Sequence, residues 1–301
     1  MMMISTERML AEGLMTLQID SKNKSFERQV DEFCKHYGAV PAALSKQWFD
    51  LTTTQIKEVK LSEKEKSEKG LKTFLRAHYF LWNYPKNSNN FASRFKICER
   101  YARGKHVWDM VGKIAALKAI KIVWTKDLDD PSTATYALQT DGTDFRCWEV
   151  KHPFFNIDTK QMSKKFNHGA LKYEVGLSVF EPRCVWINGP FRGGEHDMTI
   201  FRSALKAKIK PWKKCIADSG YESSRADEQM LATPNVFDSK ELAKFKSRAR
   251  LRLETFNGRL KNYQALAETF RHGKNKHKLA FEAIVVTTQY SMENGKPIFD
   301  V

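Results

Sequence analysis

The fold is decided by residues 136–145, which read Tyr136-Ala-Leu-Gln-Thr-Asp-Gly-Thr-Asp-Phe145. The run up to Thr140 is strand-like, and the Asp-Gly pair that follows it is typical of a turn. Further strand-like runs follow at 145–150, 173–179, 184–187 and 214–217, and predicted helices lie at 198–209 and 240–266. This alternation predicts an α/β domain over residues 134–301, with a mixed central sheet flanked by helices.

The region before this domain has the periodicity of helices. Apolar residues recur at helical spacing from Leu71 to Trp82 until Pro85 interrupts the pattern. A short helix over 91–95 and a longer one from 99 to about 117 follow, which predicts a small all-α, helix-turn-helix-like domain over 71–125. Its longer helix carries Arg100, Arg103 and Lys105, the donors that a recognition helix needs for DNA. Three packed helices with basic flanks also occur as a plain scaffold.

Residues 1–70 are polar and end in a mixed-charge run over 57–69, which is typical of a solvated helix or linker. We therefore treat them as a variable N-terminal region. The apolar spacing within it predicts one short helix, over 26–37.

The charge balance favours a polyanionic partner. The chain has 51 lysines and arginines against 35 acids, a formal net charge of +16, and such an excess attracts nucleic acid over long range. Charge alone does not separate DNA from RNA or an anionic membrane. The five cysteines lack any Cys-x-x-Cys spacing, so neither a zinc site nor a disulfide framework is indicated. No apolar run is long enough for a membrane span, so a soluble intracellular protein is expected.

Three acids carry the predicted chemistry. Asp141 and Asp218 each follow a strand-like run, and Glu254 lies beside the apolar stripe of the helix over 240–266. Taken alone, each aspartate is more often part of an ordinary turn, and Glu254 could pair on the surface with Arg250 or Lys261. Taken together, two strand-end aspartates and a helix glutamate form a set of hard oxygen ligands that suits Mg²⁺ or Mn²⁺. We therefore predict that these three acids are catalytic.

Basic residues are concentrated around Glu254. Between residues 240 and 278 there are twelve lysines and arginines against three acids. The helical spacing places Lys244, Arg248, Arg252 and Arg259 on one face, away from the apolar stripe, which predicts contact with DNA phosphates. The alternative is a solvated helix face without a partner.

These motifs resemble the DDE superfamily endonuclease domain of Harbinger-like transposases. Besides the three acids, the segment Gly189-Pro-Phe-Arg-Gly-Gly-Glu-His-Asp197 is similar to that family's Gly-x-x-His-Asp element, and the ending over 289–301 is similar as well. The resemblance covers roughly residues 134–301 and implies an RNase H-like fold, with Asp197 as a further metal ligand. Asp197 could instead serve as a helix N-cap. Thr140 departs from the family, which usually has an apolar residue there.

The resemblance implies a divalent-metal-dependent DNA endonuclease or transposase. The alternative is a domesticated, catalytically silent DNA-binding protein derived from one. The expected partners are double-stranded DNA, a separate Myb-like DNA-binding protein and further copies of this chain on the DNA, with no membrane. The DNA substrate and the basic run over 274–278 suggest a nuclear location.

Overall fold

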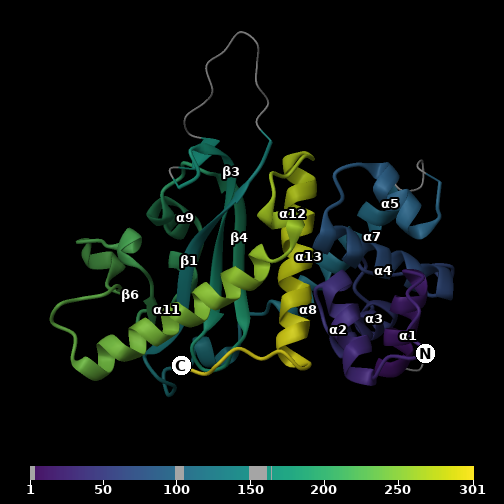
Figure 1. Cartoon of the computed structure of the whole chain (residues 1–301). Coiled ribbons are helices and arrows are strands. Elements are labelled where there is room, and N and C mark those ends of the chain that lie inside the picture. The colour runs from purple at the N-terminus through teal and green to yellow at the C-terminus, as the bar shows by residue number, and fades with distance from the viewer. Residues whose placement is uncertain (1–3, 99–104, 149–160, 164) are drawn as a thin grey trace, which may run out of the picture. The chain divides into compact units, whose positions relative to one another are not determined.

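The structure is a computed structural model that describes residues 4–98, 105–148, 161–163 and 165–301. The chain has a mixed α/β structure and divides into two compact units (Figure 1). The helical unit comprises Met1–Lys121, Leu260–Glu268 and Asn275–Pro297. The sheet unit comprises Ile122–Arg259, Thr269–Lys274 and Ile298–Val301.

The helical unit is built from short amphipathic helices and one long buried helix. The bounds are α1 (Thr6–Thr16), α2 (Phe26–Tyr37), α3 (Pro41–Thr53), α4 (Glu68–Asn83), α5 (Ser88–Phe95), α7 (Lys105–Ala116), α8 (Lys118–Lys121), α12 (Gln264–Ala267) and α13 (Lys274–Glu293). Ser5 and Ser25 are the N-caps of α1 and α2, and their hydroxyls accept hydrogen bonds from the backbone N–H groups of Arg8 and Arg28. Helix α13 is buried along most of its length from His277 to Met292, as expected of a helix in the middle of a core.

The helices predicted over 26–37, 71–82 and 91–95 are observed as α2, α4 and α5. The longer predicted helix is observed as α7 from Lys105, and Arg100 and Arg103 lie outside the described residues. Residues 1–70 differ from the polar region that the composition predicted, because α1 to α3 bury Leu14, Phe33 and other apolar side chains in the helical unit. Residues 275–297 also belong to this unit, whereas the sequence pattern predicted one domain from 134 to 301.

Among the described residues, the sheet unit contains a six-stranded sheet, and the predicted mixture of parallel and antiparallel strands is confirmed. Its strands are β1 (Tyr136–Arg146), β2 (Met162–Ser163), β3 (His168–Ser178), β4 (Cys184–Arg192), β5 (Lys214–Ile216) and β6 (Leu231–Ala232). The order is β2-β3-β1-β5-β6, with β4 also paired to β3. Strand β3 is antiparallel to β1, β2 and β4, while β5 is parallel to both β1 and β6.

The predicted turn at Asp141 is wrong. Of the strand predicted over 145–150, residues 145 and 146 belong to β1, and residues 149 and 150 lie outside the described residues. Strand β1 continues through Asp141, which pairs with Val175, and Gly142 pairs with Glu174 of β3. The long antiparallel ladder with β3 thus overrides the turn tendency of the Asp-Gly pair. Thr140 is buried, and its hydroxyl donates to the carbonyl of Val175 at 3.0 Å. Its polar side chain therefore does not prevent burial of the strand.

The remaining helices of the sheet unit are α9 (Asp197–Ser203), α10 (Leu205–Lys208), α11 (Lys240–Lys261) and the 3₁₀ turns η1 (Lys126–Leu128), η3 (Ser219–Tyr221) and η4 (Ala226–Glu228). The single helix predicted over 198–209 is interrupted at Ala204, whose backbone is not helical (φ −152°, ψ −54°). The helix predicted over 240–266 is observed as α11 and α12, with a break between them.

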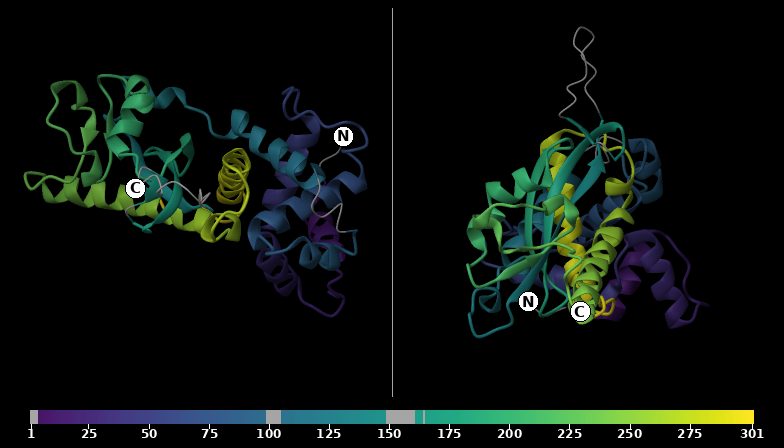
Figure 2. Two further views of the ribbon diagram at one scale, coloured as in Figure 1. Left: turned by 90° about the horizontal axis from the view of Figure 1, so that it is seen from above. Right: turned by 90° about the vertical axis from the view of Figure 1, so that its left-hand side faces the viewer.

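Helices α9 and α11 cover opposite faces of the sheet (Figure 2). Asp141 is hydrogen-bonded to Asn257 of α11, whereas the next residue, Gly142, lies against Asp197 of α9. Because successive residues of a strand point to opposite faces, α11 and α9 must lie on different sides of β1. Among the described helices, none is long and apolar enough to cross a membrane.

Candidate active site

The three predicted catalytic acids line one small cavity in the sheet unit. Asp141 comes from β1, Asp218 follows β5, and Glu254 comes from α11; Thr140, Arg250 and Leu253 complete the lining. The cavity has a volume of about 40 Å³, which is room for a few water-sized particles. The structure therefore brings together acids that lie far apart in the sequence.

The sheet topology explains the placement of the two aspartates. Strand β5 pairs with β1 only as far as Gln139 and ends at Ile216, so Asp141 lies just beyond the end of its neighbour. Asp218 follows β5 and caps η3, where its Oδ1 accepts a hydrogen bond from the backbone N–H of Gly220 at 2.9 Å. Asp141 is held from the other side, because the Asn257 amide donates to its Oδ2 at 3.3 Å.

The packing of α11 places the glutamate. Ala249, Leu253, Phe256 and Leu260 form a buried stripe at alternating spacings of three and four residues. Glu254 follows Leu253 and is exposed at the edge of this stripe, where it lines the cavity. Arg250, one of the two surface partners considered for Glu254, lines the same cavity.

Asp197 lies next to this cavity, on the other side of β1. It is the first residue of α9, and the N-cap is His196, which makes no side-chain capping bond. A Cβ on Gly142 would collide with Oδ1 of Asp197. A Cβ on Gly220 would lie 3.5 Å from its Oδ2 and 3.0 Å from Oδ1 of Asp218. The carboxylate of Asp197 therefore lies against the backbone beside Asp141 and close to Asp218, and Asp197 is not the helix N-cap.

A lysine that the sequence did not single out lies among these acids. Lys172 of β3 places its Nζ 3.1 Å from Oδ1 of Asp197, 3.8 Å from Oδ1 of Asp144 and 2.9 Å from the carbonyl oxygen of Glu195. Its side chain is only 12% exposed. The pairing register and the position of α9 bring Lys172 and Asp197 together, and neither can be read from the local sequence.

A second unpredicted residue is Glu174, which pairs with Gly142 across β1 and β3. It is fully buried, and the indole N–H of Trp186 donates to its Oε2 at 2.8 Å. Burial, assisted by the negative charge of Asp197, raises the pKa of Glu174 to about 7. Burial also raises the pKa of Tyr221, and the charges of Glu174, Asp197 and Asp141 contribute to that rise. The site is therefore strongly acidic on both sides of β1.

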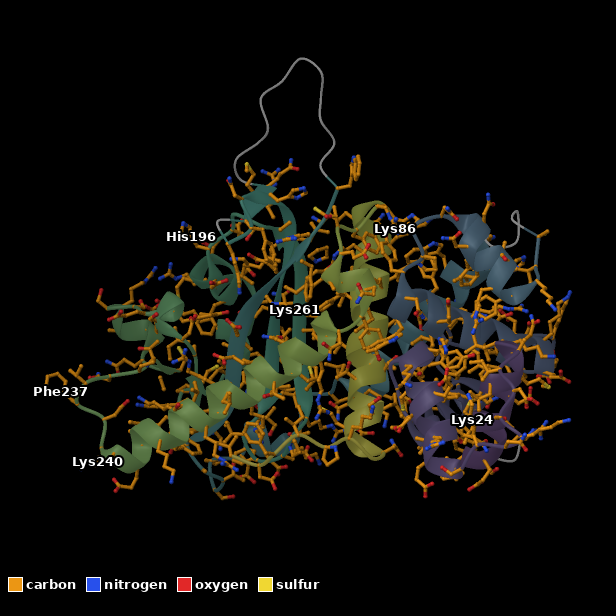
Figure 3. All side chains as sticks on the ribbon, in the orientation of Figure 1. Lys24, Lys86, His196, Phe237, Lys240 and Lys261 are labelled. Atoms are coloured by element: carbon orange, nitrogen blue, oxygen red, sulfur yellow. The ribbon has the colours of Figure 1, made fainter. Side chains whose placement is uncertain are left out.

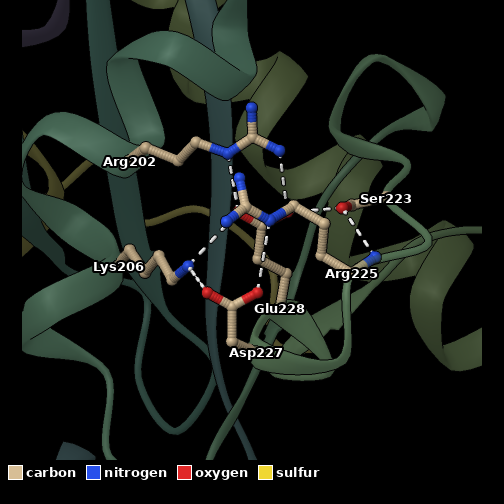
Figure 4. Close-up of polar contacts among 6 residues, drawn as sticks. All are labelled: Arg202, Lys206, Ser223, Arg225, Asp227 and Glu228. Carbon is tan, nitrogen blue, oxygen red and sulfur yellow. Dashed lines mark hydrogen bonds and ion pairs between the residues drawn. The ribbon is translucent and has the colours of Figure 1, made fainter.

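A polar network holds the segment after Asp218 onto α9 (Figure 4). Arg202 makes two hydrogen bonds to Glu228, of 2.6 and 2.9 Å, and the hydroxyl of Ser223 donates to the same carboxylate. Lys206 pairs with Asp227 at 2.5 Å. The bonds from Arg202 hold the pKa of Glu228 well below its usual range. This network fixes the segment that begins at Asp218 against the helix that begins at Asp197.

The donor set of the cavity fits a hard divalent cation. Asp141, Asp218 and Glu254 supply carboxylate oxygens to the cavity, and Mg²⁺ and Mn²⁺ prefer carboxylate and water oxygens. In the part of the chain that the structure describes, no three His, Cys, Asp or Glu side chains are already grouped as ligands of one ion.

The predicted DNA-binding face of α11 requires one correction. Lys244 and Arg248 are exposed, and Arg259 is half-buried. Arg252 is fully buried, its guanidinium donates to the carbonyl of Ser178, and burial lowers its pKa to about 10. Lys244, Arg248 and Arg252 follow one another at steps of four residues, and each such step exceeds one helical turn by roughly 40°. The successive side chains therefore rotate around α11, and Arg252 faces the sheet. Arg252 is thus a core residue and not a surface contact. Lys105 is exposed at the start of α7.

No family model matches this chain, and no curated protein or solved structure matches it either.

Proposed function

We propose that this chain is a divalent-metal-dependent DNA endonuclease of the DDE transposase type, with Asp141, Asp218 and Glu254 as its catalytic acids. The observation that supports the proposal is their convergence on one cavity from β1, the end of β5 and α11. The mixed sheet with helices on both faces is consistent with an RNase H-like fold for this unit.

The reaction is cleavage of a phosphodiester. The oxygen of a water molecule, or of a DNA 3′-hydroxyl in strand transfer, forms a bond to phosphorus as the bond to the leaving oxygen breaks. Bound Mg²⁺ or Mn²⁺ would ease loss of the proton from the attacking water or hydroxyl to solvent and stabilise the leaving oxygen. Asp141, Asp218 and Glu254 would hold the metal, with Asp197 beside them.

Neighbouring side chains have supporting roles in this proposal. Asn257 orients Asp141 through its hydrogen bond, and Lys172 holds Asp197 in place. Arg250 lines the cavity and is the cation best placed to neutralise a phosphate oxygen there.

The same proposal covers the binding of DNA. Lys244 and Arg248 would contact phosphates of double-stranded DNA along α11, with Arg259 at its other end. The α5–α7 segment with Lys105 would act as a helix-turn-helix. A Myb-like partner, further copies of this chain on the DNA and a nuclear location complete the proposal; these rest on the family resemblance.

The test is nicking of supercoiled plasmid in Mg²⁺ or Mn²⁺. We expect Asp218→Asn to reduce nicking at least a hundredfold, because a carboxylate ligand and its charge are lost together. Asp127→Asn is the matched control, since Asp127 is an exposed acid of the same unit that does not line the cavity. Nicking that survives in Asp218→Asn would remove the assignment.

The second candidate function is the silent DNA-binding protein, and the same experiment separates it from the nuclease. In that case the wild-type protein would bind duplex DNA but would not nick it in either metal, and Asp218→Asn would bind equally well.

A further inference from the structure

Two consecutive apolar side chains lie almost fully in solvent on the loop between β6 and α11. Val236 is 92% exposed and Phe237 is 91% exposed. Figure 3 shows Phe237 at the outer end of this loop, which leads into α11 at Lys240. Single exposed apolar residues are common on proteins, but this pair, here called the apolar tip, occupies the turn itself.

The base of the loop is firmly anchored. The Nζ of Lys246 lies 2.8 Å from both carboxylate oxygens of Asp238 and donates to the carbonyl of Thr233 at 3.0 Å. The side chains of this ion pair are only 8% and 9% exposed. Within the turn, the backbone N–H of Phe237 donates to the Asn235 side chain at 3.0 Å. The apolar tip is therefore held outward by a preformed turn.

The apolar tip precedes the most basic element of the sheet unit. Helix α11 has eight lysines and arginines against two acids, and Lys240, Lys244 and Arg248 are exposed along its first three turns. Fourteen residues separate Lys240 from Glu254, a rise of about 21 Å at 1.5 Å per residue. That is the length of about six base pairs of DNA. A duplex following the basic side chains from the cavity would thus meet the apolar tip.

We propose that the apolar tip is a wedge that inserts between stacked bases of double-stranded DNA bound along α11, beyond the end of the helix that is remote from Glu254. This inference rests on the proposed nuclease function. Apolar side chains inserted between base steps partly unstack them and bend the duplex, and an aromatic ring stacks on a base of any sequence. Lys240 and Lys244, which follow the tip in the sequence, are exposed and positively charged. They favour DNA as the partner, because lysines are depleted in the cores of protein–protein interfaces.

The test uses a duplex of about 30 base pairs with 2-aminopurine at several positions, which is longer than the span from cavity to tip. Binding is measured in EDTA, so that it does not depend on cleavage. We expect wild-type protein to increase 2-aminopurine fluorescence as bases unstack. Phe237→Ala should abolish the increase and weaken binding about tenfold, and Phe237→Trp should retain both. Phe26→Ala is the control, because Phe26 is also an exposed aromatic residue, at 51%, in the helical unit.

Because the Phe237 side chain makes almost no packing contact, its removal should leave the fold intact, which a melting curve can check. Unchanged affinity and fluorescence in Phe237→Ala would overturn the wedge, even if the wild-type protein nicks plasmid. Phe237-dependent binding to anionic vesicles or to another protein, without unstacking of DNA, would overturn it as well. Phe237-dependent unstacking by a protein that never nicks DNA would support the wedge and remove the nuclease.

Discussion

Glu174 illustrates at the scale of one residue how the site is built. Its carboxyl group is fully buried on β3, and burial raises its pKa from 4.5 to about 7. In the unfolded chain the group ionises near its ordinary pKa, whereas in the folded protein it resists ionisation until about pH 7. The folded state is therefore penalised progressively as the pH rises from about 4.5 to 7, and fully above 7.

Replacing Glu174 with glutamine removes this penalty while retaining an oxygen that can accept from Trp186. The shift corresponds to roughly 3 kcal/mol, so Glu174→Gln should be more stable than the wild type by up to that amount at pH 8. At pH 5 the difference should be much smaller. Urea unfolding at both pH values in EDTA measures it, with the half-exposed Glu181→Gln as control. An equal gain in stability at pH 5 and pH 8 would rule out this explanation.

Single residues also show what the sequence could and could not predict. Asp141, Asp218 and Glu254, which line one cavity, could be predicted as a group because each carries a local signal, a strand-like run or an apolar stripe beside an acid. Lys172 and Glu174 carry none, since a lysine or glutamate in a strand usually faces water. Their role depends on the β1–β3 register and on α9, which long-range pairing determines.

At the scale of the element, β1 and α11 differ from prediction for related reasons. The Asp-Gly pair in β1 has a turn tendency, but nine consecutive pairs with β3, from Leu138 to Arg146, keep it extended. In α11 the apolar stripe was predicted correctly. The predicted basic face wrongly included Arg252, which is buried where the helix meets the sheet. Tertiary packing decided both cases.

The corrected face of α11 gives a prediction about salt dependence. If Lys244 and Arg248 each neutralise one DNA phosphate, replacing either with glutamine should lower the slope of log affinity against log salt by about 1. The double variant should lower it by about 2. Lys210→Gln is the control, since Lys210 is an exposed lysine of the same unit that follows α10 and is not part of α11. A slope that stays unchanged in the double variant would show that DNA does not follow α11.

At the scale of the whole molecule, the two units are interleaved along the chain. The helical unit includes Leu260–Glu268 and Asn275–Pro297, which follow the main segment of the sheet unit, Ile122–Arg259, in the sequence. The sequence predicted one continuous domain from 134 onward because neither segment is marked by a linker. The distinguishing signal was in α13 itself, whose apolar and small residues occur on all sides, as in a helix at the centre of a core.

This interleaving predicts that residues 1–121 do not fold alone. In the full chain α13 buries the side chains of Phe281, Ile284, Val285 and Val286. It also forms hydrogen bonds from Gln47 to Thr287, at 3.3 Å, and from Tyr290 to Asp50, at 2.6 Å. Burial of an apolar side chain is worth roughly 1.5–3 kcal/mol, so four of them approach the total stability of a typical domain.

We therefore expect the fragment 1–121 to have reduced helical circular dichroism, to bind a hydrophobic dye and to unfold without a cooperative transition. Joining residues 260–297 to it through a flexible Gly/Ser linker should restore a cooperative transition, because the missing helices α12 and α13 are then supplied. This linked chain lacks most of the sheet unit, so it shows whether fragment 1–121 fails to fold because α12 and α13 are missing or because the sheet unit is missing. A cooperative transition in 1–121 alone would mean that α13 covers an already stable core and does not complete it.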